Sequence, residues 1–125
     1  MNTIVLRGKE FPIVFDTQNA KELQKTFGSL QEAVAKLANN DLETSGTVVW
    51  LMIREGVLLQ NEELGLHDKP PTKEAILRRI SYAGLKDPQF SQAIVDTFNE
   101  FMGGNVTGQE AMEVGLELME AVKKS

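Results

Sequence analysis

Residues 4–16 read IVLRGKEFPIVFD, and this stretch decides how the fold begins. Two apolar runs rich in β-branched and aromatic residues flank a short polar segment, which predicts a strand, a turn and a second strand. Gly8 can adopt positive φ at no steric cost, and the two charged residues after it, Lys9 and Glu10, are expected at a solvated tip. We therefore predict a β-hairpin over about residues 3–15.

The predicted hairpin has features of a strand pair that needs a partner. Pro12 cannot donate to a strand ladder, so the second strand is expected at a sheet edge. Two strands alone are marginally stable in water. The hairpin must therefore pack on helices or on another copy of itself.

The rest of the chain is dominated by helical signals. Capping residues and glycine stops divide it into a bundle of about five to six helices over about residues 17–123, so the fold class is mainly α (α+β) in a single domain, 1–125. The expected helix starts are Asp16 or Thr17, Ser29, Asp41, Thr72, Asp87-Pro88 and Thr107, and the expected stops include Gly28, Gly84 and Gly103-Gly104.

The third predicted helix is the most apolar, and we expect it to form the centre of the core. Residues 48–53 are apolar nearly all round, which places Trp50 in the core. Either this helix breaks at Gly56 or it continues to Leu64 with Gly65 as its stop, and helix propensity favours a weak point at Gly56.

Two further predictions concern the helices that follow. One helix is expected from Thr72 to Gly84, with Ala75, Ile76, Ile80 and Tyr82 on its apolar side. The next helix is expected to present an apolar side made by Phe90, Ile94, Val95, Phe98, Phe101 and Met102.

Composition and charge limit the classes of function. The chain has no cysteine, which excludes disulfides and thiolate metal sites, and we expect neither a secretory signal peptide nor a membrane span. The formal charge of −5 argues against nucleic-acid binding, although Lys73, Arg78, Arg79 and Lys86 surround the fourth predicted helix. The default compartment is the cytoplasm.

No residue pattern points to an enzyme. His67 is the only histidine, and it lies in a polar loop without a partner at catalytic spacing. Phosphate-binding loops, HExxH helices and EF-hand loops have no counterpart in the sequence. We expect no catalytic residue, no metal site and no cofactor.

The last two predicted helices carry the candidate binding surface. On the final helix, glutamates fall on one face and apolar residues on the opposite face. This pattern fits either a core helix with an acidic outside or one wall of an adaptable groove for a partner. The candidate partner-binding residues are Phe98, Phe101, Met102, Met112, Leu116 and Met119.

The order of these features resembles that of the tail assembly chaperones of long-tailed (siphovirus-type) bacteriophages and prophages. The resemblance rests on LRGKEFPIVFD, on KELQKTFGSLQEAVAKL, on the apolar helix that follows, and on ISYAGLKDPQF with IVDTFNEFMGG downstream. It implies a hairpin followed by helices and a non-enzymatic function in the bacterial cytoplasm.

The resemblance also implies the partners. Such a chaperone binds the tape measure protein, promotes assembly of the tail-tube protein around it, and is absent from the mature virion. Self-association through the N-terminal hairpin is a further expectation, because an edge strand can pair with a neighbouring copy. Two alternatives remain open: a structural tail or head–tail joining subunit, and a small cytoplasmic DNA-binding regulator.

Overall fold

The protein begins with an antiparallel hairpin and continues as six helices, in a computed structural model that describes residues 1–39 and 41–101. The fold class is mainly α with an N-terminal two-stranded sheet, as the sequence predicts. The elements are β1 (Asn2–Leu6), β2 (Lys9–Ile13), α1 (Thr17–Phe27), α2 (Leu30–Ala38), α3 (Leu42–Leu64), α4 (Lys73–Leu77), α5 (Tyr82–Leu85) and α6 (Pro88–Phe101).

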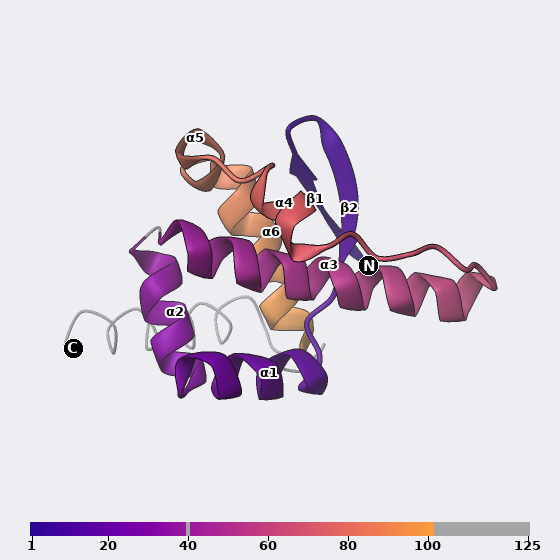
Figure 1. Ribbon diagram of the computed structural model, residues 1–125, viewed down its shortest axis with the longest axis horizontal. Helices are drawn as coiled ribbons and strands as arrows, with labels where there is room; N and C mark the ends of the chain where they lie inside the picture. The colour runs from indigo at the N-terminus through magenta and orange to yellow at the C-terminus, as the bar shows by residue number, and fades with distance from the viewer. Residues whose placement is uncertain (40, 102–125) are drawn as a thin grey trace.

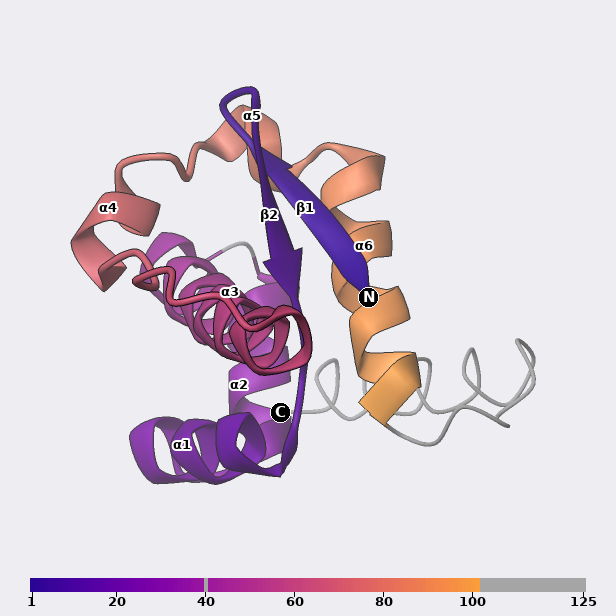
Figure 2. The same ribbon diagram turned by 90° about the vertical axis from the view of Figure 1, so that its right-hand side faces the viewer.

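Helix α3 runs through the middle of the molecule. Figure 1 shows the hairpin on one side of α3 and helix α1 on the other, and Figure 2 shows the hairpin between α3 and α6. The inward face of the hairpin carries Ile4, Leu6, Phe11 and Ile13, which are at most 6% exposed. These side chains join one hydrophobic core with apolar residues of α3 and α6.

The hairpin closes through a two-residue turn at Arg7 and Gly8. Both residues have positive φ, 48° and 79°, which is the backbone of a type I′ turn. Leu6 pairs with Lys9, and the register continues to Asn2 opposite Ile13. The tip is therefore Arg7-Gly8. Lys9 and Glu10, which we predicted at the tip, belong to β2, where both are exposed.

Local capping signals account for most helix ends. The side chains of Asp16, Ser29, Asp41, Thr72 and Ser81 accept hydrogen bonds from backbone N–H groups in the first turns of α1 to α5. Gly65 adopts the left-handed conformation and ends α3.

Helix α3 passes through Gly56 without interruption, so the weak point expected there is absent. The glycine has a packing role instead. A Cβ at Gly56 would overlap the Pro12 carbonyl group and lie 2.6 Å from its carbon and 3.0 Å from the Ile13 nitrogen. The backbone of β2 approaches α3 closely only because Gly56 has no side chain.

The single helix predicted from Thr72 to Gly84 is wrong. Helix α4 ends at Leu77, and α5 starts after Ser81, whose hydroxyl accepts a hydrogen bond from the Gly84 N–H at 3.1 Å. A serine that caps the backbone three residues ahead competes with continuation of the helix. Tyr82 is consequently 59% exposed rather than part of an apolar stripe.

Trp50 and Val95 are more exposed than predicted. Trp50 is half-buried at the rim of the core, where its indole N–H donates to the Pro71 carbonyl oxygen at 3.1 Å. This bond satisfies the one polar atom of the side chain and attaches the loop before α4 to α3. Val95 is 48% exposed, although Phe90 and Ile94 of the same helix are buried.

Candidate functional site: the open edge of the hairpin

The outward-facing backbone groups of the hairpin follow from its register. Leu6 and Lys9 flank a two-residue turn and therefore exchange backbone hydrogen bonds. Hydrogen-bonded and non-hydrogen-bonded pairs alternate along an antiparallel ladder, so Ile4 and Phe11 exchange backbone hydrogen bonds as well. The backbone groups of Thr3 and Val5 on β1 then point away from β2. On the other strand, Glu10, Pro12 and the following Val14 point away from β1.

The edge of β2 is covered by α3 at Pro12 and Val14. The Val14 N–H donates to the Met52 carbonyl oxygen at 3.1 Å, and the Pro12 carbonyl lies against Gly56. Because proline has no backbone N–H, the close contact at Pro12 leaves no donor without an acceptor. The prediction that the second strand lies at a sheet edge is correct, and this edge is occupied.

The edge of β1 is open in the part of the chain that the structure describes. Among residues 1–39 and 41–101, the backbone N–H and C=O groups of Thr3 and Val5 make no hydrogen bond outside the hairpin. Both residues are exposed, and Val5 retains 58% of its accessible surface. An unpaired strand edge of this kind is a template for another strand.

A groove with a volume of about 470 Å³ lies along this open edge. Residues 3–8 form one wall, and the segment from Arg79 to Ala93 forms the other. The groove is bounded at the Asn2 end, where the Asn2 side-chain amide donates to the Thr97 hydroxyl at 3.3 Å. Its apolar lining is supplied by Ile4, Leu6, Ile80, Leu85, Phe90 and Ala93.

The turn end of the groove is positively charged. Arg7 is exposed in the turn, and the Arg79 guanidinium lies 6.0 Å from the centroid of the Phe11 ring and 3.5 Å from the Leu6 carbonyl oxygen. Asp87 also lines the groove, but its Oδ1 accepts a hydrogen bond from the Gln89 N–H at 2.9 Å. Two arginines and one aspartate, whose carboxylate caps the start of α6, therefore give this part of the groove a net charge of +1.

The aromatic residues predicted to bind a partner pack inward in the structure. Phe98 and Phe101 contact Phe15, with ring centroids 4.4 Å and 4.8 Å apart, and attach α6 to the segment after β2. The other four predicted binding residues, Met102, Met112, Leu116 and Met119, lie outside the residues that the structure describes. The structure therefore gives Phe98 and Phe101 a packing contact and brings neither of them to the groove.

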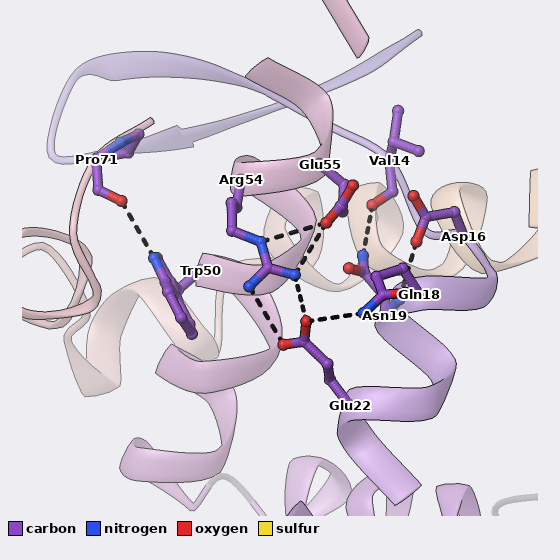
Figure 3. A network of polar contacts seen from close by, with 9 residues as sticks. All are labelled: Val14, Asp16, Gln18, Asn19, Glu22, Trp50, Arg54, Glu55 and Pro71. Carbon is purple, nitrogen blue, oxygen red and sulfur yellow. Dashed lines mark hydrogen bonds and ion pairs between the residues drawn. The ribbon is translucent and has the colours of Figure 1, made fainter. Parts of the chain in front are cut away.

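A cluster of charged side chains joins α1 to α3 (Figure 3). Arg54 binds Glu22 through two hydrogen bonds of 2.7 Å and 3.2 Å and also contacts Glu55 at 2.9 Å. The hydrogen bonds from Arg54 lower the pKa of Glu22, whereas burial raises the pKa of Glu55 and the nearby Asp16 carboxylate adds to that rise. Arg54, Glu22 and Glu55 thus bind one another, and we interpret the cluster as a structural contact that holds α1 against α3.

The same region contains a buried asparagine that fixes the entry to α1. Asn19 is 0% exposed, and its amide donates to the Val14 carbonyl oxygen at 3.0 Å (Figure 3). Its backbone N–H donates to Asp16 Oδ1 at 2.9 Å. These bonds hold the chain where it leaves the hairpin.

The described part of the chain offers no group of three or more histidine, cysteine, aspartate or glutamate side chains placed to hold a metal ion. His67 lies exposed in the loop after α3, where both hydrogen bonds of the Asn61 side chain go to the backbone of the neighbouring Asp68. No helix within residues 1–39 and 41–101 has the length and apolar character needed to cross a lipid bilayer.

Sequence reasoning did not find the groove, although the strand that forms one of its walls carried a signal. Pro12 identified one edge of the hairpin, and strand alternation then assigns Thr3 and Val5 to the other. The far wall depends on the break between α4 and α5, which the sequence prediction missed. A comparison with known proteins adds no further guide, because no protein-family model, curated protein or solved structure matches the chain.

Proposed function

We propose that the protein is a non-enzymatic assembly chaperone of a long-tailed bacteriophage or prophage, which binds the tape measure protein and promotes assembly of the tail tube. The observation that carries the proposal is the hairpin, which has one edge covered by α3 and the other open beside a groove. A small domain with this feature is suited to binding a polypeptide.

Two properties of the chain support the proposal. The hairpin followed by helices has the order that the resemblance to tail assembly chaperones implies. The formal charge of −5 would keep several copies dispersed when they are bound along one long partner. With many copies per partner, modest affinity at each site is strengthened by multivalency.

The proposed place of action is the cytoplasm of the bacterial host, and we expect the protein to be absent from the mature virion. The tape measure protein is the main partner, and the tail-tube protein is a further one. Self-association through the hairpin remains part of the proposal as a second use of the open edge.

Co-expression with the tape measure protein of the same phage or prophage tests the proposal. We expect the soluble fraction of the tape measure protein to rise severalfold and the two proteins to copurify. Separate fractions, with the tape measure protein still insoluble, would contradict the proposal. Stoichiometric amounts of the protein in purified virions would favour a structural tail or head–tail joining subunit instead.

A double variant tests the C-terminal residues assigned to binding. Replacing Leu116 and Met119 with serine should leave the melting temperature unchanged and abolish capture of the tape measure protein. A large drop in melting temperature would instead assign these side chains to the core, where each large-to-small substitution costs about 2–5 kcal/mol of stability. Normal folding with normal capture would show that the interface lies elsewhere.

A further inference from the structure

We infer that the groove beside β1 binds an extended peptide segment, which adds to the hairpin as a third strand and places an acidic side chain near Arg7 and Arg79. The groove has the geometry of a site for an extended segment, and the inference rests on the proposed function for the partner that supplies this segment. The inference deepens the proposed function by giving a binding mode and a sequence pattern for the segment recognised.

The hydrogen-bonding groups of the groove have the spacing of a strand. Thr3 and Val5 are two residues apart on β1, so their outward groups repeat at about 6.6–6.8 Å. Together they offer two N–H donors and two C=O acceptors, which one extended chain can satisfy with four hydrogen bonds. A helical ligand uses its backbone groups internally and could not bind them.

The size of the groove favours a single chain over a second hairpin. The second wall contains Phe90 and Ala93 of α6, and the Asn2–Thr97 contact joins β1 to the same helix. A second copy that paired through its own β1 would bring a second strand, its β2, about 4.8 Å farther out. The volume of about 470 Å³ suits one short segment better than two strands.

Strand alternation then sets the side-chain pattern of the ligand. Every second side chain would share the face of Ile4 and Leu6 and meet the apolar lining that Leu85 and Phe90 supply. The intervening side chains would share the solvent-exposed face of Thr3 and Val5. The volume of about 470 Å³ lies within the range of small-ligand sites and suits a few residues rather than a long strand.

Charge complementarity completes the pattern. The chain carries a formal charge of −5, yet the groove is lined by the guanidinium-bearing side chains of Arg7 and Arg79 against one carboxylate, Asp87. Arginine is also an uncommon choice at the first position of a type I′ turn, where asparagine is favoured. A carboxylate at the corresponding end of the ligand would form charge-assisted hydrogen bonds with these groups.

A synthetic peptide provides the probe. Two capped hexapeptides of alternating threonine and valine, one with aspartate first and one with aspartate last, cover both strand directions. Titration into the ¹⁵N-labelled full-length protein should shift the amide resonances of Thr3 and Val5 and give a dissociation constant below 1 mM for at least one peptide. Absence of binding by both peptides at that concentration would overturn the inference.

Backbone methylation of the peptide separates strand addition from apolar adhesion. N-methyl groups on one set of alternate residues remove the N–H groups that face β1, and those on the other set remove only outward N–H groups. We expect one methylated peptide to lose at least tenfold in affinity and the other to bind as the parent does. Equal affinities would overturn the inference without requiring any protein variant.

Val5→Pro tests the protein side of the contact. The Val5 N–H points into the groove and is not used by the hairpin, so the variant should fold, and Val5→Thr is the control that keeps the N–H. We expect at least tenfold weaker peptide binding by Val5→Pro and near wild-type binding by Val5→Thr. Unchanged binding by a folded Val5→Pro would contradict strand addition.

The remaining outcomes also decide between explanations. A concentration-dependent dimer that Val5→Pro abolishes, in a protein that binds neither peptide, would assign the edge to a second copy and overturn the inference. If the tape measure protein is solubilised but the peptides do not bind, the binding mode fails and the proposed function stands. If the peptides bind and the tape measure protein stays insoluble, the proposed function fails alone.

Discussion

Gly56 shows how a single residue sets the position of the hairpin. It lies in the interior of α3, where glycine costs about 1 kcal/mol relative to alanine, yet the helix is continuous there. The cost is offset by the close approach of β2, whose Pro12 carbonyl occupies the space of a side chain. Sequence propensity reads such a glycine as a weak point, because the strand that packs on it lies more than forty residues away in the chain.

Gly56→Ala should therefore destabilise the protein despite its higher helix propensity. The added Cβ would contact backbone atoms of Pro12 and Ile13, which cannot rotate away, so we expect a net loss of about 2 kcal/mol in the free energy of unfolding. Gly46→Ala, in the same helix, is the matched control: its nearest neighbour is the end of the Leu77 side chain, which can change rotamer. Urea denaturation measures both, and an equal or smaller loss for Gly56→Ala would refute this packing.

The Arg54–Glu22 pair should make stability depend on pH. Its hydrogen bonds lower the pKa of Glu22 below the ordinary value of 4.5, so the unfolded chain binds more protons as the pH falls. The contribution is thus present above the unfolded-state pKa and is lost as the pH falls through the folded-state pKa. Glu55, whose pKa burial raises, acts in the opposite direction but is common to wild type and variant.

Glu22→Gln should cost up to about 1 kcal/mol at pH 7, as expected for a partly exposed ion pair. The difference from wild type should shrink as the pH falls below about 4. Glu10→Gln, which changes an exposed carboxylate of β2, is the control. Urea denaturation series from pH 3 to pH 7 measure the effect, and a constant difference across that range would argue against the assigned role of Glu22.

At the scale of elements, local chemistry predicted helix starts better than helix extents. Asp16, Ser29, Asp41 and Thr72 each cap a helix within three residues of themselves, so a short window of sequence contains the whole signal. The division between α4 and α5 was missed because apolar spacing over residues 75–82 suggests one helix, whereas the Ser81 cap starts a new one. The burial of Trp50 was overestimated because the acceptor of its indole N–H, the Pro71 carbonyl oxygen, lies in a loop that is distant in the sequence.

The hairpin turn is an element whose sequence is not optimal for its geometry. Arg7 has φ of 48°, in the left-handed region where asparagine is favoured over other residues with a side chain. Arg7→Asn should therefore raise the free energy of unfolding by up to about 1 kcal/mol. Arg7→Ala, which lacks both the charge and the preference for this conformation, serves as the comparison. Thermal unfolding of the wild type and both variants decides, and equal stability of the wild type and Arg7→Asn would mean that the turn tolerates arginine without cost.

For the whole molecule, the sequence predicted the order of elements and missed the candidate site. Strand alternation and capping act over a few residues, and they gave the hairpin and most helix starts. The groove forms only when residues 3–8 lie opposite residues 79–93, an arrangement that depends on how α3 and α6 pack around the hairpin. The periodicity of apolar residues within either segment contains no information about how the two segments are placed relative to each other.

Hydrogen exchange tests the central claim, an open β1 edge, most directly. At low protein concentration, the amides of Thr3 and Val5 should exchange nearly as fast as in an unstructured chain, whereas Ile4 and Leu6 should be protected by pairing with β2. Val14 provides the internal comparison, because its N–H donates across the covered edge to Met52 and should be protected too. Protection of Thr3 and Val5 equal to that of Ile4 and Leu6 would show that the edge is already occupied and would contradict the account.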